Sequence, residues 1–425
     1  MQQERMNHKV KNVMQTLDKM IEPNKNNFDK ESIIDILTLR YARKLKSSLP
    51  KLTWNDFKFD NLNPSESKIE NLIQNNIKRS ITNPESESIS VALSGGIDSS
   101  LVLALLKKTL PKSKIKAFSV KFSNSVDESQ EAAKIAESLD INHETIFLEN
   151  YLSELPKAIS IIKEPFWDLH FYHVAKKSQK YDYLLSGDGS DELFAGYVFR
   201  YKKFLQSVTE KSTPLEKVKA YLNCHERDWV PKQQEIFSKK MNFSWNKIYS
   251  SLLPYFDNSL CLLDQVILAD FNGKLLYNWS PLFTQISNFF NVKLITPILS
   301  KETINYAFSI PNHLKYDQNM NMGKLQLRKL LAKYVDKSLI QTKKQGFSVD
   351  TINLWKSYGK NICDYYITDG NIVKDGWINK EWIMKNIHKT DLDIRHINKF
   401  LGLLGFEIWY RLFITHEIKS DTKLN

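Results

Sequence analysis

The stretch SISVALSGGIDSS, residues 88–100, decides the fold, because an apolar strand pattern runs directly into a loop of small residues. Apolar side chains occupy every second position from Ile89 to Leu93, which predicts a β-strand over 88–93. The residues after the loop, LVLALL at 101–106, are apolar on every side, which predicts a buried helix. A strand, a tight turn and a helix in this order form half of a βαβ unit.

The same alternation continues downstream. Further strands are predicted over 114–122, 143–148 and 181–185, with helices over 127–139 and 151–162 between them. Strands and helices that alternate at this spacing form right-handed βαβ units and a parallel sheet. We therefore expect an α/β fold, a doubly wound parallel sheet, followed beyond Tyr201 by a mostly helical C-terminal part.

Composition limits the classes of protein. The chain has 425 residues, of which 42% are hydrophobic and 25% charged, and these globular values exclude a collagen, a coiled-coil rod and low-complexity disorder. Its 3 cysteines show no CxxC spacing, which argues against a disulfide scaffold or a zinc module. The net charge of +12 comes from scattered lysines, so a solvated surface is favoured over a nucleic-acid partner.

One domain boundary is indicated, at the turn-rich segment ITNPESES, residues 81–88. We expect residues 1–80 to form a short N-terminal region and residues 81–425 to form the main domain. With no apolar span of about 20 residues and no apolar leader, we expect a cytoplasmic protein without a membrane partner.

The first loop, SGGIDSS at 94–100, has the composition of an anion site. Its glycines allow close backbone approach, its serines add donors, and the next helix directs its N-terminus at the loop. The loop residues in question are Ser94, Gly95, Gly96, Asp98, Ser99 and Ser100. There is no GxxxxGK[ST] pattern, and Asp98 would repel phosphate unless a cation such as Mg²⁺ lay between them. The alternative is a plain strand-to-helix turn capped by serine.

The second loop, SGDGSDELFAGY at 186–197, follows the strand predicted over 181–185 and repeats this logic. Small residues allow close approach, and Asp188, Asp191 and Glu192 supply carboxylates for a cation. The alternative is an ordinary capped helix start, because acidic residues are favourable in a first turn.

SGGIDSS resembles the pyrophosphate-binding loop of the PP-loop ATP pyrophosphatases, which include asparagine, GMP and argininosuccinate synthetases and tRNA-modifying enzymes. The two loops together resemble the asparagine synthetase family, whose second loop reads G-[DE]-G-x-D-E-[LVI]-F-x-G-Y, and the match is unbroken from Gly187 to Tyr197. The resemblance implies an adenine nucleotide alpha-hydrolase-like fold. It also implies cleavage of ATP between the α- and β-phosphates and an adenylated intermediate.

The resemblance implies a role for individual residues of this chain. Asp98 and Asp191 would hold the Mg²⁺ that bridges the phosphates of ATP, and Asp191 and Glu192 would belong to the catalytic set. The nucleotide would contact the first loop and, outside it, Leu93, Val120, Ser186, Gly187 and Asp188. For Val120, an ordinary core position is an equal alternative.

The segment KKQGFS, residues 343–348, resembles a lysine loop with a K-x-G-F core. Lys344 aligns with the family's lysine and would stabilise negative charge on the acyl oxygen and the phosphate. A solvated surface lysine is the alternative.

Two departures from the family bear on the substrates. Residue 2 is Gln2 and no cysteine precedes Cys224, so we expect no glutaminase activity in this chain. The nitrogen would come from free ammonia, a partner glutaminase subunit or the amine of another substrate.

The second departure lies in the acceptor segment at 284–300. There the family's polar residues fall on Thr284, Gln285, Lys293 and Ile295, which weakens the inference of an aspartate substrate.

The expected function is ATP-dependent amide-bond formation through a carboxylate adenylate, giving AMP and pyrophosphate, with asparagine as the simplest product. Within the family, β-lactam synthetases and lasso-peptide cyclases use an internal amine, so another amide or a lactam is an alternative product. A PP-loop tRNA-modifying enzyme and a non-catalytic ATP-binding subunit are the alternatives from other classes.

Overall fold

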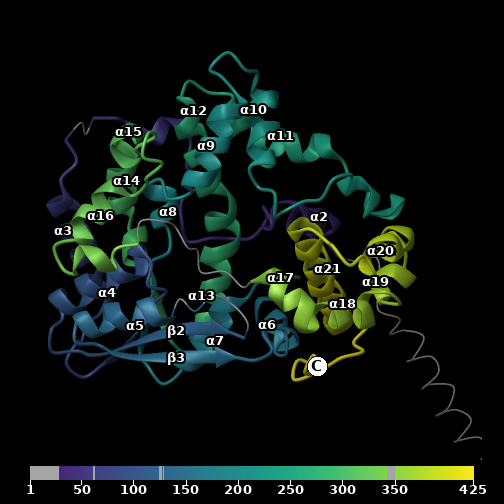
Figure 1. Ribbon diagram of the computed structural model, residues 1–425, viewed down its shortest axis with the longest axis horizontal. Coiled ribbons are helices and arrows are strands. Elements are labelled where there is room, and N and C mark those ends of the chain that lie inside the picture. Colours follow the sequence, from purple (N-terminus) through teal and green to yellow (C-terminus); the bar gives the residue numbers. More distant parts are fainter. Residues whose placement is uncertain (1–27, 61–62, 124–126, 128, 342–349) are drawn as a thin grey trace, which may run out of the picture.

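A computed structural model describes residues 28–60, 63–123, 127, 129–341 and 350–425 of the chain (Figure 1). Its strands form one sheet in the order β3-β2-β1-β4-β5, and every neighbouring pair is parallel. The strands are β1 (Ser88–Ala92), β2 (Lys114–Phe122), β3 (Asn142–Leu148), β4 (Tyr183–Leu185) and β5 (Lys293–Ile295). The predicted parallel α/β sheet is confirmed.

The strand order reverses between β1 and β4. From β1 the chain moves one way to β2 and β3, and it then returns to the other side of β1 as β4. Because parallel crossovers are right-handed, this reversal places the connecting helices on opposite faces of the sheet. Packing agrees with two layers: α4 (Ile97–Thr109) contacts α5 (Ser129–Ser138), whereas α13 (Ser280–Phe289) contacts α6 (Leu155–Ile162) and α7 (His170–Ser178). Ligands bind such sheets at this switch point.

Beyond Tyr201 the described residues are mostly helical, as predicted, and they include the short edge strand β5. The prediction missed β5 because three residues, KLI, carry too little alternation to distinguish a strand. Its backbone pairs with β4 from Tyr183↔Lys293 to Leu185↔Ile295. The acceptor segment is thereby fixed at the edge of the sheet, next to the strand that leads into the second loop.

The other helices cover the sheet and extend away from it (Figure 1). They are α8 (Ser190–Leu193), α9 (Val198–Ser207), α10 (Pro214–Asn223), α11 (Trp245–Phe256), α12 (Leu262–Asp270), the π-helical η4 (Phe271–Trp279), α14 (Lys301–Ser309), α15 (Asn312–Lys315), α16 (Leu325–Leu331), α17 (Thr351–Leu354), the π-helical η7 (Trp355–Gly359), α18 (Lys360–Ile367), α19 (Asn371–Lys374), α20 (Lys380–Ile387) and α21 (Ile394–Phe413). Short 3₁₀ turns occupy Trp54–Asp56, Gln233–Glu235, Lys239–Met241, Pro297–Leu299 and Lys337–Leu339. None of the described helices is both long enough and apolar enough to cross a lipid bilayer.

Two helices of the N-terminal region pack onto the rest of the chain. The first, α2 (Lys30–Leu39), is capped by the Asp29 carboxylate and lies beside α21, where Lys399 Nζ donates a hydrogen bond to the Leu37 carbonyl (Figure 1). The second, α3 (Glu66–Ser80), packs its buried isoleucines against α4. Both helices therefore belong to the same hydrophobic core as the sheet.

Candidate functional site

The first and second loops touch at the switch point. They follow β1 and β4, which are adjacent and parallel, so both loops leave the sheet at the same edge. A Cβ added to Gly187 would lie 2.6 Å from the carbonyl carbon of Asp98 and 2.7 Å from the backbone nitrogen of Ser99. Since real side chains do not approach backbone so closely, only glycine permits this contact between the loops.

Hydrogen bonds within the first loop hold its shape. The backbone N–H of Ser94 donates to Ser99 Oγ at 3.1 Å, and that of Gly96 donates to Ser94 Oγ at 3.3 Å. Gly95 adopts φ +71°, a left-handed conformation that glycine accepts without strain. Ser100 is fully buried at the start of α4. The serines thus act as turn-forming residues, while the loop itself lies at the helix N-terminus where an anion would bind.

Asp98 and Asp191, one from each loop, converge on a single ammonium group. Lys324 Nζ lies 2.5 Å from Asp98 Oδ2 and 2.6 Å from Asp191 Oδ1. Burial alone would lower the pKa of Lys324, but the two carboxylates outweigh it and raise that pKa well above its ordinary value. The structure therefore brings the two predicted metal ligands to one cation position and places a lysine in it.

Glycines on either side create the space for Lys324. A Cβ on Gly196 would lie 1.7 Å from Asp191 Oδ1 and 2.4 Å from Lys324 Cε, and a Cβ on Gly323 would lie 1.9 Å from the Ala195 carbonyl oxygen. Sequence reasoning missed Lys324. Its local signal is a glycine directly before a lysine at a helix start, a pattern too common to mark a site without the structure.

Glu192 lies deeper than the other carboxylates of the second loop. It is 1% exposed, and its Oε1 accepts a hydrogen bond of 2.6 Å from the Tyr197 hydroxyl. Burial, together with the neighbouring negative charge of Asp191, raises the pKa of Glu192 to about 8. A carboxyl group whose pKa lies near neutrality can exchange protons at working pH, which suits a general base.

Asp188 and Ser186 form the start of the second loop. The Ser186 hydroxyl donates to the Asp188 carboxylate. Burial raises the pKa of Asp188, and this hydrogen bond, with nearby His170, offsets part of the rise. His170 begins α7 and its Nδ1 lies 3.4 Å from Asp168 Oδ1. The structure thus adds a histidine beside the second loop that the loop motifs alone did not reveal.

The remaining predicted residues fall in three environments. Leu93 and Val120 are buried at the carboxyl ends of β1 and β2, the edge from which the first loop leaves. Lys344 lies within 342–349, outside the described residues, so its role stays a prediction. In the acceptor segment, Lys293 Nζ donates to the Ser80 carbonyl at 3.1 Å, and Ile295 is buried.

Comparison with known proteins identifies the family of the chain. The sequence matches the family described as asparagine synthase over residues 69–411. It is 27% identical over 365 residues to asparagine synthetase (glutamine-hydrolysing) 1 of Bacillus subtilis strain 168, covering 76% of this chain and 56% of that protein. A putative asparagine synthetase (glutamine-hydrolysing) of Mycobacterium tuberculosis H37Rv is 23% identical over 372 residues, covering 78% of this chain and 55% of that protein.

Among solved structures, an NH₃-dependent NAD synthetase from Campylobacter jejuni covers 32% of this chain and 62% of its own, at 21% identity and a TM-score of 0.24. That likeness is too partial to bear on function. The chain spans about half the length of the curated relatives that it matches. Because the family match covers most of the chain, including both loops, the chain belongs to the asparagine synthase family.

Proposed function

We propose that this protein forms an amide bond at the expense of ATP, through a carboxylate adenylate. Asparagine made from aspartate and ammonia is the simplest product. The observation that carries the proposal is the convergence of Asp98 and Asp191 on one cation position, 2.5 and 2.6 Å from the same nitrogen, where the two loops meet. Family membership supports an ATP-using synthetase in general terms.

The two aspartates suit magnesium, which prefers carboxylate oxygens together with substrate phosphates. Their oxygens already face a common point that accepts a positive charge. Magnesium held by Asp98 and Asp191 would neutralise charge on the phosphates of ATP. Lys324 would then be displaced from the pair toward the phosphates, where its ammonium also compensates negative charge.

In the first step, a carboxylate oxygen of the acceptor attacks the α-phosphorus of ATP. The bond between that phosphorus and the oxygen bridging to the β-phosphate breaks, and pyrophosphate leaves. In the second step, the nitrogen of ammonia or an amine attacks the acyl carbon, and AMP leaves with the acyl-oxygen bond pair. Glu192 accepts the proton that the nitrogen loses, as its raised pKa permits. Lys344 is the predicted cation for the acyl oxygen.

A different amide or a lactam is the second candidate. It is favoured by the acceptor segment, where the positions of the family's Glu and Arg hold an exposed Lys293 engaged with the Ser80 carbonyl and a buried Ile295. Neither side chain reproduces the charge of the residue that it replaces, so the acceptor need not be aspartate.

Pyrophosphate release from ATP and Mg²⁺ by the purified protein tests the proposal, with aspartate and ammonium as the first substrate pair. Release that requires both substrates and disappears in Asp98→Ala supports asparagine formation. ATP binding without release would move the search to another acid or to an amine substrate. Failure of the protein to bind ATP contradicts the proposal and favours a non-catalytic subunit that retains only the fold. Salt-sensitive retention of tRNA would favour the RNA-modifying reading.

A further inference from the structure

Lys324 reaches the two aspartates from a backbone conformation that a lysine seldom adopts. It lies at the start of α16 with φ +58°, in the left-handed region that strains every residue except glycine. Its N–H donates to the Phe194 carbonyl at 2.9 Å, inside the second loop. Gly323, directly before it, packs so closely against Ala195 that no side chain would fit there. A strained residue persists only where its surroundings hold it.

Arg328 holds the other side of this peptide. Its Nε donates to the Gly323 carbonyl at 3.0 Å, so the side chain folds back over the first turn of α16. Gly323 is buried, and its carbonyl would lose this partner if the guanidinium were removed. Nη1 of the same guanidinium donates to the Gln341 carbonyl at 2.7 Å. One planar group therefore fixes two backbone carbonyls that are distant in sequence.

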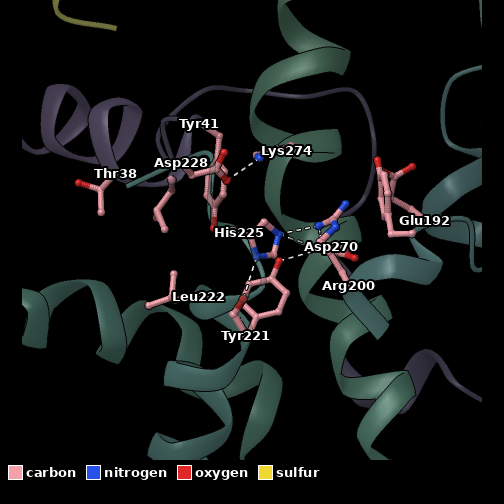
Figure 2. Close-up of a pocket in the computed structure, with 12 residues that line it drawn as sticks. Thr38, Tyr41, Glu192, Arg200, Tyr221, Leu222, His225, Asp228, Asp270 and Lys274 are labelled. Carbon is pink, nitrogen blue, oxygen red and sulfur yellow. Dashed lines mark hydrogen bonds and ion pairs between the residues drawn. The ribbon is translucent and has the colours of Figure 1, made fainter. Parts of the chain in front are cut away.

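Arg328 is used differently from Arg200, which follows the second loop on α9. Arg200 forms an ion pair with Asp270 at 2.7 Å, and beside them Lys274 pairs with Asp228 (Figure 2). Arg328 gives its donors to carbonyls, and no carboxylate among the described residues forms an ion pair with it. An arginine paired with a carboxylate balances a charge. An arginine that joins two carbonyls fixes the position of the backbone.

The geometry of these contacts suits arginine and not lysine. A guanidinium presents its N–H groups in one rigid plane and in fixed directions, so the carbonyls of Gly323 and Gln341 are reached together. A lysine carries all its donors on one nitrogen at the end of a flexible chain. Replacing Arg328 with lysine therefore keeps the positive charge and loses the fixed geometry, which separates the two effects.

We infer that Arg328 is a positioning residue: it holds the ammonium of Lys324 between Asp98 and Asp191, which closes that cation position to Mg²⁺ until nucleotide binds. The ammonium and the metal would use the same two carboxylates, so each excludes the other. A lysine whose backbone is already fixed competes better than a mobile one, because less freedom is lost when it binds. The inference rests on the proposed function, which puts Mg²⁺ at this position.

Arg328→Lys tests the inference through metal binding, without any reaction. Thermal unfolding of the whole chain is measured without nucleotide in MgCl₂ and in NaCl at equal ionic strength. The wild type should show no saturable response to Mg²⁺. Arg328→Lys should gain one, with a half-saturating concentration at least about tenfold below any that the wild type shows. Tenfold corresponds to about 1.4 kcal/mol, at the low end of what a hydrogen bond to a charged group contributes. Crystals of the variant soaked in Mn²⁺ should show anomalous density between the two aspartates.

Arg79→Lys is the matched control, because Arg79 is an exposed arginine of α3 that pairs with Glu302 at 2.7 Å. It should respond to Mg²⁺ as the wild type does. A double variant asks whether Arg328 acts through Lys324. In Lys324→Met the carboxylates are already open to Mg²⁺, so adding Arg328→Lys should leave the half-saturating concentration unchanged.

The outcomes separate this inference from the proposed function. A Mg²⁺ response in Lys324→Met but none in Arg328→Lys overturns the inference and leaves the proposed function standing. No response in either variant overturns both. A further gain from Arg328→Lys in the Lys324→Met background also overturns the inference, because the arginine would then act on the metal directly. Should Arg328→Lys not fold, Arg328→Gln replaces it, and the double variant with Lys324→Met shows how much of the response comes from the lost charge alone.

Discussion

Replacing Lys324 with methionine should leave two carboxylates facing each other without their shared cation. The methionine keeps the length of the side chain and the left-handed backbone at this position, φ +58°, so the change removes mainly the charge. Because Asp98 Oδ2 and Asp191 Oδ1 lie 2.5 and 2.6 Å from the same nitrogen, they are at most about 5 Å apart. Two unit charges at about 5 Å repel by about 3 kcal/mol at an effective dielectric of about 20.

The expected loss of stability is therefore about 3 kcal/mol at pH 8, the lower end of what breaking a buried pair costs. For a chain of this length, at about 2.1 cal/mol/K per residue, it corresponds to a fall of about 3 °C in the unfolding temperature. The loss should shrink as the pH falls toward about 5, because one carboxylate of the pair then takes up a proton in the variant. The wild type should not show this dependence, since the raised pKa of Lys324 keeps its ammonium charged throughout that range.

The effect of Mg²⁺ on the unfolding temperature tests this account more directly than the pH dependence does. Without nucleotide, Mg²⁺ should stabilise Lys324→Met and leave the wild type unchanged, because the wild-type carboxylates already hold an ammonium. At about one hundred times its Kd, Mg²⁺ would return about 2.7 kcal/mol. Differential scanning calorimetry with and without MgCl₂ measures both effects. Lys329→Met is the control, because Lys329 lies on the same helix, is exposed and sits 3.9 Å from Glu66. Equal stabilisation of wild type and variant by Mg²⁺ would refute this account of the site.

Three further predictions concern the same loops and one buried acid. Gly187→Ala should abolish ATP binding measured by calorimetry, because its Cβ would lie 2.6 Å from the Asp98 carbonyl carbon. Gly376→Ala should bind ATP normally, because its Cβ meets no atom within 4 Å and the strain at its φ of +70° lies outside both loops. The amide-forming rate should rise with pH through the raised pKa of Glu192, about 8, and Glu192→Gln should flatten that rise; an unchanged pH profile would exclude Glu192 as the base. Burial raises the pKa of Glu164 to about 7, so its contribution to stability is lost as the pH rises through that value, and Glu164→Gln should unfold at a higher temperature than wild type at pH 8 but not at pH 4.

The parallel sheet, and the place of both loops after its strands, were accessible from sequence for a clear reason. Apolar residues recur along β1 and β2 because the middle of each strand is buried, while the polar residues between them include serines whose hydroxyls bond to backbone carbonyls. The strand predicted over 114–122 has those bounds in the structure. Local pattern weakens at the edges of the sheet. The strand predicted from Tyr181 begins only at Tyr183, and β5 was not predicted at all, because their short pairing depends on neighbouring strands.

Sequence likewise predicted only part of the candidate site. Asp98, Asp191 and Glu192 stand in contiguous loop motifs, so their proximity follows from two adjacent parallel strands. Lys324 reaches the site from the start of α16, distant in sequence, and is recognisable only by its contacts with the two aspartates. A lysine before a helix is common on protein surfaces. Sequence therefore located the two loops but not the lysine that the rest of the fold brings against them.

The position of Lys324 along the chain sets the order in which the site can be assembled during synthesis. The ribosome releases both acidic loops long before residue 324, so a nascent chain holds Asp98 and Asp191 with no lysine to separate their charges. The last long helix, α21, emerges later still, and the N-terminal helix α2 packs against it. A truncated product that ends before residue 324 would thus carry both acidic loops without the lysine between them and without the helices that the complete chain packs around the sheet.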